Sequence, residues 1–261
     1  MRTLTLSALA ASLLLMGTDS AHAAHFDVNV YQQGGELQIG GFDFGELTFG
    51  AAEVFEGELM DPDEDGQFTG DDPGWTALSD ASVGSLPAGA DNLPGSVDVS
   101  LDIVLGLGGR SLSFWDGTGS VSFGPTTGAE VLEVTDFLGG VSVLDGSAGA
   151  AGMALGTTSA TGLLHEHIDY ALYGDASLTP DDVTEGIYLV EAQIGVDGFL
   201  DPSSSFFILF GTFTEENEVE MEEAIELAEA WVETNLVPEP GTLLLLASGL
   251  TGLLVVGRRR D

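Results

Sequence analysis

The sequence contains no cysteine and no lysine, and only 5 basic residues accompany 43 acidic ones, which gives a formal net charge of −38. The lack of cysteine excludes disulfides, iron–sulfur clusters, cysteine-ligated zinc and thiol catalysis. The lack of lysine excludes the lysine-containing glycine loop that cradles phosphates. Because so acidic a chain cannot neutralise phosphate groups, we expect no nucleic-acid partner and no attraction to anionic lipid surfaces.

The few basic residues are unevenly distributed. All 5 are arginines, and only Arg110 lies outside the two ends of the chain. The body should therefore attract cations, and it should fold better where salt screens its self-repulsion. Two interpretations stay open, and they are compatible: the general acidity of a protein from a saline habitat, or a surface that holds divalent cations. The hydrophobic content of 44% is enough for a folded core.

Residues 1–23 have the composition of a cleavable secretion signal. Arg2 supplies the positive start, and the apolar run over 6–16 is too short to span a membrane. Small residues at Ala21 and Ala23 predict cleavage by signal peptidase after Ala23. The mature chain would then begin at Ala24, with His25 as its second residue.

Residues 238–261 form a tail with three parts. An uncharged, leucine-rich stretch over 241–257 separates Pro238, Glu239 and Pro240 from Arg258, Arg259 and Arg260. The apolar run and its basic cluster predict a transmembrane helix with cytoplasmic arginines. The order of the parts resembles the PEP-CTERM sorting signal of Gram-negative bacteria. That resemblance implies cleavage by an exosortase in the inner membrane, a transient anchor, a place at the cell surface or in the extracellular matrix, and a link to exopolysaccharide and biofilm. A permanent tail anchor is the alternative.

The body between the two ends is expected to be mainly β. Short apolar segments separated by Gly, Asp and Pro predict an antiparallel, jelly-roll-like β-sandwich over residues 24–214. The strands are expected at 26–30, 37–39, 47–49, 97–105, 111–115, 121–123, 130–137, 141–144, 187–194 and 206–210. The small-residue stretch over 145–159 is expected to be a loop, and two small β domains divided there are the alternative.

One acidic amphipathic helix is expected over residues 215–237. An apolar stripe recurs at roughly helical spacing, formed by Val219, Ile225, Ala228, Trp231 and Val232. The same stretch holds nine glutamates and no basic residue. Like charges four residues apart destabilise an isolated helix, so this one should dock through the Trp231 face or depend on salt.

The strongest candidate for metal binding is a pair of histidines in an acidic segment. On a single strand, His165, His167 and Asp169 would point to one side, where two imidazoles and a carboxylate can hold a transition metal. His25, followed two residues later by Asp27, would add an N-terminal chelating group. The alternative is partly exposed histidines without a ligand.

A second candidate is a calcium loop that begins at Asp61. Its acidic residues and its glycine follow the spacing of an EF-hand loop, although the twelfth position is an aspartate and not the usual glutamate. The proposed ligands are Asp61, Asp63, Asp65, Gln67 and Asp72. The alternative is an acidic turn in an acidic protein.

No residue pattern points to catalysis. The chain has no Gly-x-Ser-x-Gly turn, and nothing singles out a carboxylate pair for glycoside hydrolysis. A polysaccharide hydrolase would rest on the abundance of carboxylates alone. We therefore expect no catalytic residues and no enzymatic activity.

The body also resembles a known family, through short landmarks in a fixed order. They are His25-Phe-Asp-Val, Gly35-Glu-Leu, Asp72-Pro-Gly-Trp, Phe114-Trp-Asp-Gly, Gly162-Leu-Leu-His-Glu-His, Gly186-Ile-Tyr-Leu-Val and Phe206-Phe-Ile-Leu-Phe-Gly. The order is similar to PEP-CTERM proteins known from cyanobacteria that are repressed by the zinc regulator Zur. This resemblance implies a role in zinc capture, with His25, His165 and His167 as ligands. A structural or adhesive matrix component, with calcium as an optional crosslinker, is the other hypothesis.

Overall fold

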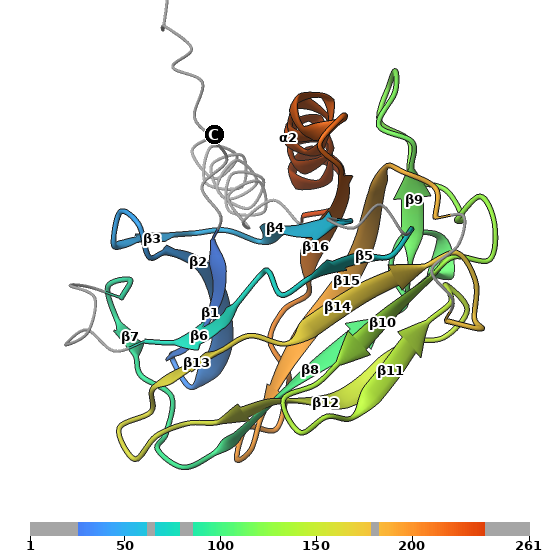
Figure 1. Ribbon diagram of the computed structural model, residues 1–261. Coiled ribbons are helices and arrows are strands. Elements are labelled where there is room, and N and C mark those ends of the chain that lie inside the picture. Colours follow the sequence, from blue (N-terminus) through green and yellow to red (C-terminus); the bar gives the residue numbers. More distant parts are fainter. Residues whose placement is uncertain (1–25, 62–65, 79–85, 179–182, 238–261) are drawn as a thin grey trace, which may run out of the picture.

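The computed structural model describes residues 26–61, 66–78, 86–178 and 183–237 (Figure 1). Several predicted features lie outside the described residues. They are the signal peptide with Ala23, the tail from Pro238 to Asp261, and the candidate ligands His25, Asp63 and Asp65. None of the helices in the described ranges has the length and apolar character needed to cross a membrane.

The prediction of a mainly β protein is confirmed, with the strands gathered in two sheets. The six-stranded sheet consists of β1 (Asp27–Gln33), β2 (Glu36–Asp43), β3 (Thr48–Gly50), β6 (Trp75–Ala77), β7 (Ala90–Asp91) and β13 (Leu164–Glu166). The ten-stranded sheet consists of β4 (Val54–Met60), β5 (Phe68–Gly70), β8 (Asp98–Val104), β9 (Ser113–Trp115), β10 (Val131–Thr135), β11 (Val141–Leu144), β12 (Ala150–Thr157), β14 (Asp169–Tyr173), β15 (Ile187–Val196) and β16 (Phe206–Phe213). A single 3₁₀ turn, η1 (Leu107–Gly109), follows β8.

The ten-stranded sheet is curled into a nearly closed barrel. Its order is β11-β10-β14-β5-β4-β16-β15-β8-β12, with β9 beside β15. The two end strands, β11 and β12, approach each other, and the backbone N–H of Phe137 donates to the carbonyl of Ala154 at 2.9 Å (Figure 1). The predicted antiparallel sandwich is therefore wrong in this detail: one sheet curls on itself.

Two strand pairs are parallel, which also departs from the prediction. β1 pairs in parallel with β6, and β4 pairs in parallel with β16. Parallel neighbours require a long crossover, and local turn residues carry no signal for such a pairing. The expectation of purely antiparallel strands came from the short turns between consecutive segments, and it failed for these long-range partners.

The stretch over 145–159, expected to be a loop, contains the strand β12. Its pairing with β8 shifts register twice, between Ala150 and Met153 and between Ala154 and Gly156. Met153 and Leu155 are buried in the main core. The bulges, together with the many small residues, hide the alternation of side chains from a sequence pattern.

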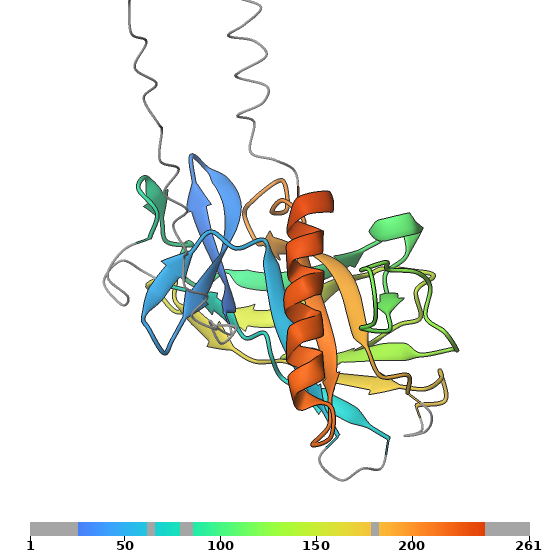
Figure 2. The same ribbon diagram turned by 90° about the horizontal axis from the view of Figure 1, so that it is seen from above.

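Two hydrophobic cores lie on opposite faces of the ten-stranded sheet. The main core joins side chains of both sheets, including Trp75 and Phe206. The second core lies between the ten-stranded sheet and the helix α2 (Glu218–Asn235), which crosses β16, β4 and β15 (Figure 2). Every residue of β16 is buried because the strand is covered on both faces.

The predicted acidic helix is confirmed, with a slightly different buried face. The residues that α2 buries are Met221, Ala224, Ile225, Ala228 and Val232. Val219, expected in the apolar stripe, is 64% exposed. Trp231 is half-buried, and its ring centroid lies 5.6 Å from that of Phe123. The helix therefore docks along a face centred on Ile225 and Ala228 rather than on Trp231.

Candidate metal centre

Three adjacent strands of the six-stranded sheet bring two distant parts of the chain together. Asp27 opens β1, whose Val28 pairs with Trp75 of β6, and β6 in turn pairs with β13 through Thr76 and His165. The Oδ2 atom of Asp27 lies 3.4 Å from Nε2 of His165. Asp27, His165 and His167 each offer a ligand atom, and these atoms all lie within 4.8 Å of one another.

The Asp27 carboxylate is the most buried member of this group. Its side chain is 13% exposed, and Oδ2 makes no hydrogen bond among the described residues. Burial raises the pKa of Asp27, and the neighbouring His167 and His165 oppose that shift. A buried carboxylate oxygen without a hydrogen-bond donor costs about 1–3 kcal/mol. A bound cation would remove that cost, so this oxygen fits a metal ligand.

The protonation of His167 follows from its hydrogen bond. Its Nδ1 lies 3.0 Å from the backbone carbonyl oxygen of Asp71, and it lies 3.6 Å from Oδ1 of Asp72. A carbonyl oxygen can only accept, so Nδ1 carries the proton. The lone pair of the neutral ring is then on Nε2. Histidines that bind metals are typically held in this way, with one ring nitrogen donating to a carbonyl or carboxylate.

The His165 ring is held by aromatic contacts. Phe44 stacks on it, with ring centroids 4.5 Å apart and planes at 13°, and Phe42 packs edge-on against Phe44 at 4.8 Å. The rings of His165 and His167 have centroids 5.4 Å apart. The stack restricts the His165 ring while leaving its Nε2 beside Asp27, so the imidazole is oriented before any ion arrives.

Asp169 is the predicted ligand that the structure places elsewhere. The prediction of one strand through His165, His167 and Asp169 is wrong, because β13 belongs to the six-stranded sheet and β14 to the ten-stranded sheet. The chain passes between the sheets at Ile168, which is buried in the core. Asp169 opens β14 and lies in neither group of possible metal ligands among the described residues.

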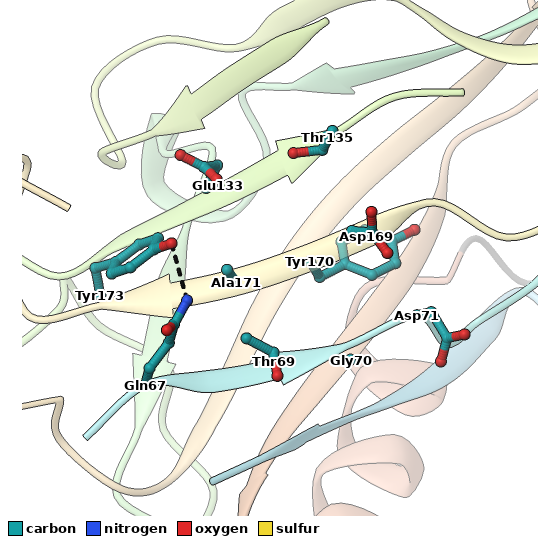
Figure 3. Close-up of a pocket in the computed structure, with 10 residues that line it drawn as sticks. All are labelled: Gln67, Thr69, Gly70, Asp71, Glu133, Thr135, Asp169, Tyr170, Ala171 and Tyr173. Carbon is teal, nitrogen blue, oxygen red and sulfur yellow. Dashed lines mark hydrogen bonds between the residues drawn. The ribbon is translucent and has the colours of Figure 1, made fainter. Parts of the chain in front are cut away.

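Asp169 instead lines an open polar groove on the outer face of β5, β14 and β10 (Figure 3). The groove has a volume of about 420 Å³, and Ala171 lies on its floor between Asp169 and Tyr173. Nε2 of Gln67 donates to the Tyr173 hydroxyl at 3.0 Å. Asp71 and Glu133 add carboxylates to the lining.

The described members of the predicted calcium loop have separate partners. Oδ2 of Asp61 accepts a hydrogen bond from the N–H of Gly66 at 2.9 Å. Gln67 reaches Tyr173 in the polar groove, and Asp72 lies beside His167. Asp63 and Asp65 of the same loop lie outside the described residues, so the calcium loop stays a prediction.

The sequence pattern indicated Asp27 only as a neighbour of His25, and it did not indicate that Phe44 stacks on the His165 ring. The order of the strands brings Asp27 to His165, and no spacing in the sequence signals that contact. The same holds for the carbonyl of Asp71, which fixes the tautomer of His167.

Comparison with protein-family models yields a match at the carboxyl end. The family model of the PEP-CTERM protein-sorting motif matches residues 236–260. No curated protein matches the chain. The matched segment contains Pro238, Glu239 and Pro240, the apolar run and the three arginines, which confirms the predicted sorting signal. By this motif the chain is an exported substrate of an exosortase, destined for the cell surface.

Proposed function

We propose that this exported protein binds a divalent transition-metal ion, zinc first, through Asp27, His165 and His167. The observation that supports the proposal most is the buried Oδ2 of Asp27, which has no hydrogen-bond donor and faces the imidazole of His165 at 3.4 Å. Two imidazoles and a carboxylate suit zinc and neighbouring metals. Calcium prefers six or more oxygen ligands, so it suits this set poorly.

The exposure of the imidazoles favours reversible binding. The side chains of His165 and His167 are 49% and 39% exposed. Three protein ligands leave a tetrahedral ion with one position for water or an outside ligand. The proposed role is capture and carriage of the ion. His25 stays a predicted fourth ligand, since it precedes Asp27 by two positions.

The proposal is tested on the protein purified after export and without chelators. Its metal content is measured, and the stripped protein is then titrated with zinc in high salt. Asp27→Asn and the double variant His165→Ala/His167→Ala should lose binding, whereas Asp169→Asn should keep it and His25→Ala should weaken it if that residue is a ligand. Unchanged zinc binding in the double variant would overturn the assigned site.

A second candidate is attachment to matrix polysaccharide. The observation that favours it is the open groove of Figure 3, whose hydroxyl, amide and carboxylate groups surround the floor at Ala171. Filling the floor with Ala171→Trp should abolish retention on purified exopolysaccharide, while Ser100→Thr on the distant strand β8 should not. Equal retention of both variants would remove this candidate.

A further inference from the structure

We infer that the open groove of Figure 3 recognises glycans whose sugar rings carry protonated amino groups, and that it rejects chains of acidic sugars. This inference rests on the second candidate of the proposed function, attachment to polysaccharide, and it names the chemical class of that ligand. The groove crosses three neighbouring strands, β5, β14 and β10. Its volume of about 420 Å³ lies within the range of about 300–1,000 Å³ that is usual for small-ligand sites.

One end of the groove holds a buried hydroxyl group (Figure 3). Tyr173 is only 9% exposed, and its hydroxyl oxygen accepts a hydrogen bond from Nε2 of Gln67 at 3.0 Å. Burial, and then the charge of Glu133, raises the pKa of Tyr173 against the opposing effect of Gln67, so the phenol keeps its proton. That O–H donates to none of the described residues. This end of the groove therefore offers a donor to a ligand oxygen, such as a sugar hydroxyl or ring oxygen.

The carboxylates of the groove are not used by their own turns. Other surface aspartates, such as Asp136 and Asp145, accept hydrogen bonds from the backbone of the turns in which they lie. Glu133 and Asp169 lie instead on the paired strands β10 and β14, and neither carboxylate accepts a hydrogen bond from a described residue. A carboxylate can only accept, so these two groups are free to receive hydroxyl or ammonium donors from a ligand.

The strand beside the groove adds apolar side chains in the same register. Val143 of β11 pairs with Glu133, and Val141 pairs with Thr135. Val143 is 41% exposed and Val141 is 57% exposed. A sugar ring has C–H faces as well as polar groups, so a glycan covers the valines with a ring face while its hydroxyl and amino groups reach the groove. A linear polyamine satisfies the carboxylates but has no ring to cover the valines.

The sign of the charge sets the preference among glycans. Asp71, Glu133 and Asp169 all line the groove, and no basic residue is part of its described lining. Arg110 is the only lysine or arginine between residues 24 and 237. A protonated amine therefore gains Coulomb attraction in the groove, a neutral ring gains none, and a sugar carboxylate is repelled. Because the groove is open to solvent, this preference should weaken as salt increases.

The first test compares ligands of equal length. Protein purified after export is titrated calorimetrically with tetramers of glucosamine, of N-acetylglucosamine and of galacturonic acid, and with spermine, a polyamine without rings. We expect the glucosamine tetramer to bind at least about tenfold more tightly than the acetylated tetramer and spermine, and the galacturonate tetramer not to bind. Equal affinity for the glucosamine and acetylated tetramers would overturn the preference for amines. Equal affinity for spermine would overturn the glycan as the ligand.

The second test separates the groove from the general attraction between an acidic protein and a cationic ligand. Asp169→Asn should weaken binding of the glucosamine tetramer by about tenfold, whereas Glu222→Gln, which removes one exposed charge on α2, should not. Tyr173→Phe should weaken the glucosamine and acetylated tetramers by the same factor, because it removes a donor and no charge. Ala171→Trp, which also changes no charge, should abolish binding of both, and thermal unfolding checks that each variant is folded. Binding that survives in folded Ala171→Trp, or equal losses in Asp169→Asn and Glu222→Gln, would overturn the assigned groove.

The failure of this inference differs from the failure of the functions on which it builds. Glycan binding that Ala171→Trp abolishes, but that shows no preference for amines, ends this inference and leaves polysaccharide attachment standing. A protein that retains no glycan of any charge ends both. Zinc binding by Asp27, His165 and His167 is measured separately, so neither result decides it.

Discussion

Gly74 packs so closely on Asp27 that a Cβ atom at position 74 would stand 2.7 Å from Oδ1 of Asp27. The same Cβ would stand 2.7 Å from Cε1 of His167. The backbone amide of Gly74 also hydrogen-bonds the Asp27 carboxylate, and its carbonyl accepts from the N–H of Val28 at 2.9 Å. The absence of a side chain at Gly74 therefore allows the carboxylate and the imidazole to lie side by side.

The first prediction concerns Gly74→Ala. The added methyl group has to displace Asp27 or His167, so zinc affinity should fall at least about tenfold, which is the effect of losing about 1.4 kcal/mol of binding free energy. Overpacking should also cost about 1–3 kcal/mol of folding stability. Calorimetric zinc titration and thermal unfolding measure the two effects.

The matched control for this change is Gly124→Ala, since a Cβ at Gly124 meets no atom within 4 Å. That variant should bind zinc like the parent. If Gly74→Ala binds zinc with unchanged affinity, the close contact around Asp27 has no part in holding an ion.

The second prediction is that Asp27→Asn stabilises the metal-free protein while abolishing zinc binding. Burial raises the pKa of Asp27 above its ordinary value of 3.8, so the folded chain holds the proton more tightly than the unfolded chain. The ionised carboxylate therefore costs stability, and that cost grows as pH rises from 3.8 through the raised pKa. The amide removes the cost, and each 1 kcal/mol recovered raises the Tm by about 2–4 °C.

Thermal unfolding of stripped protein checks this prediction. The Tm advantage of Asp27→Asn should be largest near neutral pH and should disappear below pH 3.8, where the carboxyl is protonated in both states. Adding zinc should reverse the order, because an ion at 100 times its Kd stabilises the parent by about 2.7 kcal/mol. A lower Tm for the stripped variant at neutral pH would contradict the account.

The sequence predicted those helices and strands whose side chains follow a regular period along one continuous segment. The acidic helix was expected over 215–237 and is found at Glu218–Asn235, because its apolar residues recur at a helical period. The clean alternation over 97–105 likewise predicted β8. In contrast β6 has only three residues in a stretch rich in Gly, Pro and Asp, so no period could reveal it.

The candidate site likewise has a part that the sequence predicted and a part that it did not. The His165 and His167 pair is visible in three consecutive residues, whereas Asp27 joins it only through the parallel pairing of β1 with β6. Asp169 was misplaced because alternation assumes one continuous strand, and the chain changes sheets at Ile168. Contacts between sheets depend on the packing of the whole core, which short-range spacing does not encode.

The third prediction concerns Asp136, which joins the ends of the curled sheet. Its Oδ1 accepts from the N–H groups of Leu138 and Gly140, and its Oδ2 accepts from the N–H of Ala154 in β12 at 3.1 Å. Asp136→Ala should cost about 1 kcal/mol, since the charged hydrogen bonds are largely solvent-exposed. Urea unfolding at neutral pH measures the loss.

The pH dependence of this contribution has a definite sign. Slight burial raises the pKa of Asp136, but the backbone donors, led by Gly140 and Ala154, outweigh it and lower the pKa below 3.8. The stabilisation is therefore present above pH 3.8 and is lost as pH falls through the lowered pKa. Asp145→Ala is the control, because Asp145 accepts from Ser147 within its own turn. Equal losses for the two variants would mean that Asp136 does not link β12 to the β10–β11 hairpin.

The fourth prediction concerns the acidic helix. Burial raises the pKa of Glu229, and Glu233 and Glu226 on the same face raise it further. A raised pKa means that the ionised group costs stability as pH rises above 4.5, so Glu229→Gln should increase the Tm near neutral pH. The like-charge part, about 0.2–0.5 kcal/mol for each pair, should fade in 1 M salt, where screening acts within about 3 Å.

Glu222→Gln is the charge-matched control, because Glu222 is an exposed residue of the same helix. It changes the net charge by the same amount without relieving a half-buried carboxylate. Thermal unfolding at low and high salt should therefore show a gain for Glu229→Gln that shrinks with salt but persists, since desolvation of a buried charge is not screened by ions. A gain of equal size for Glu222→Gln would mean that total charge, and not the docking of α2 at Glu229, sets the salt dependence of this fold.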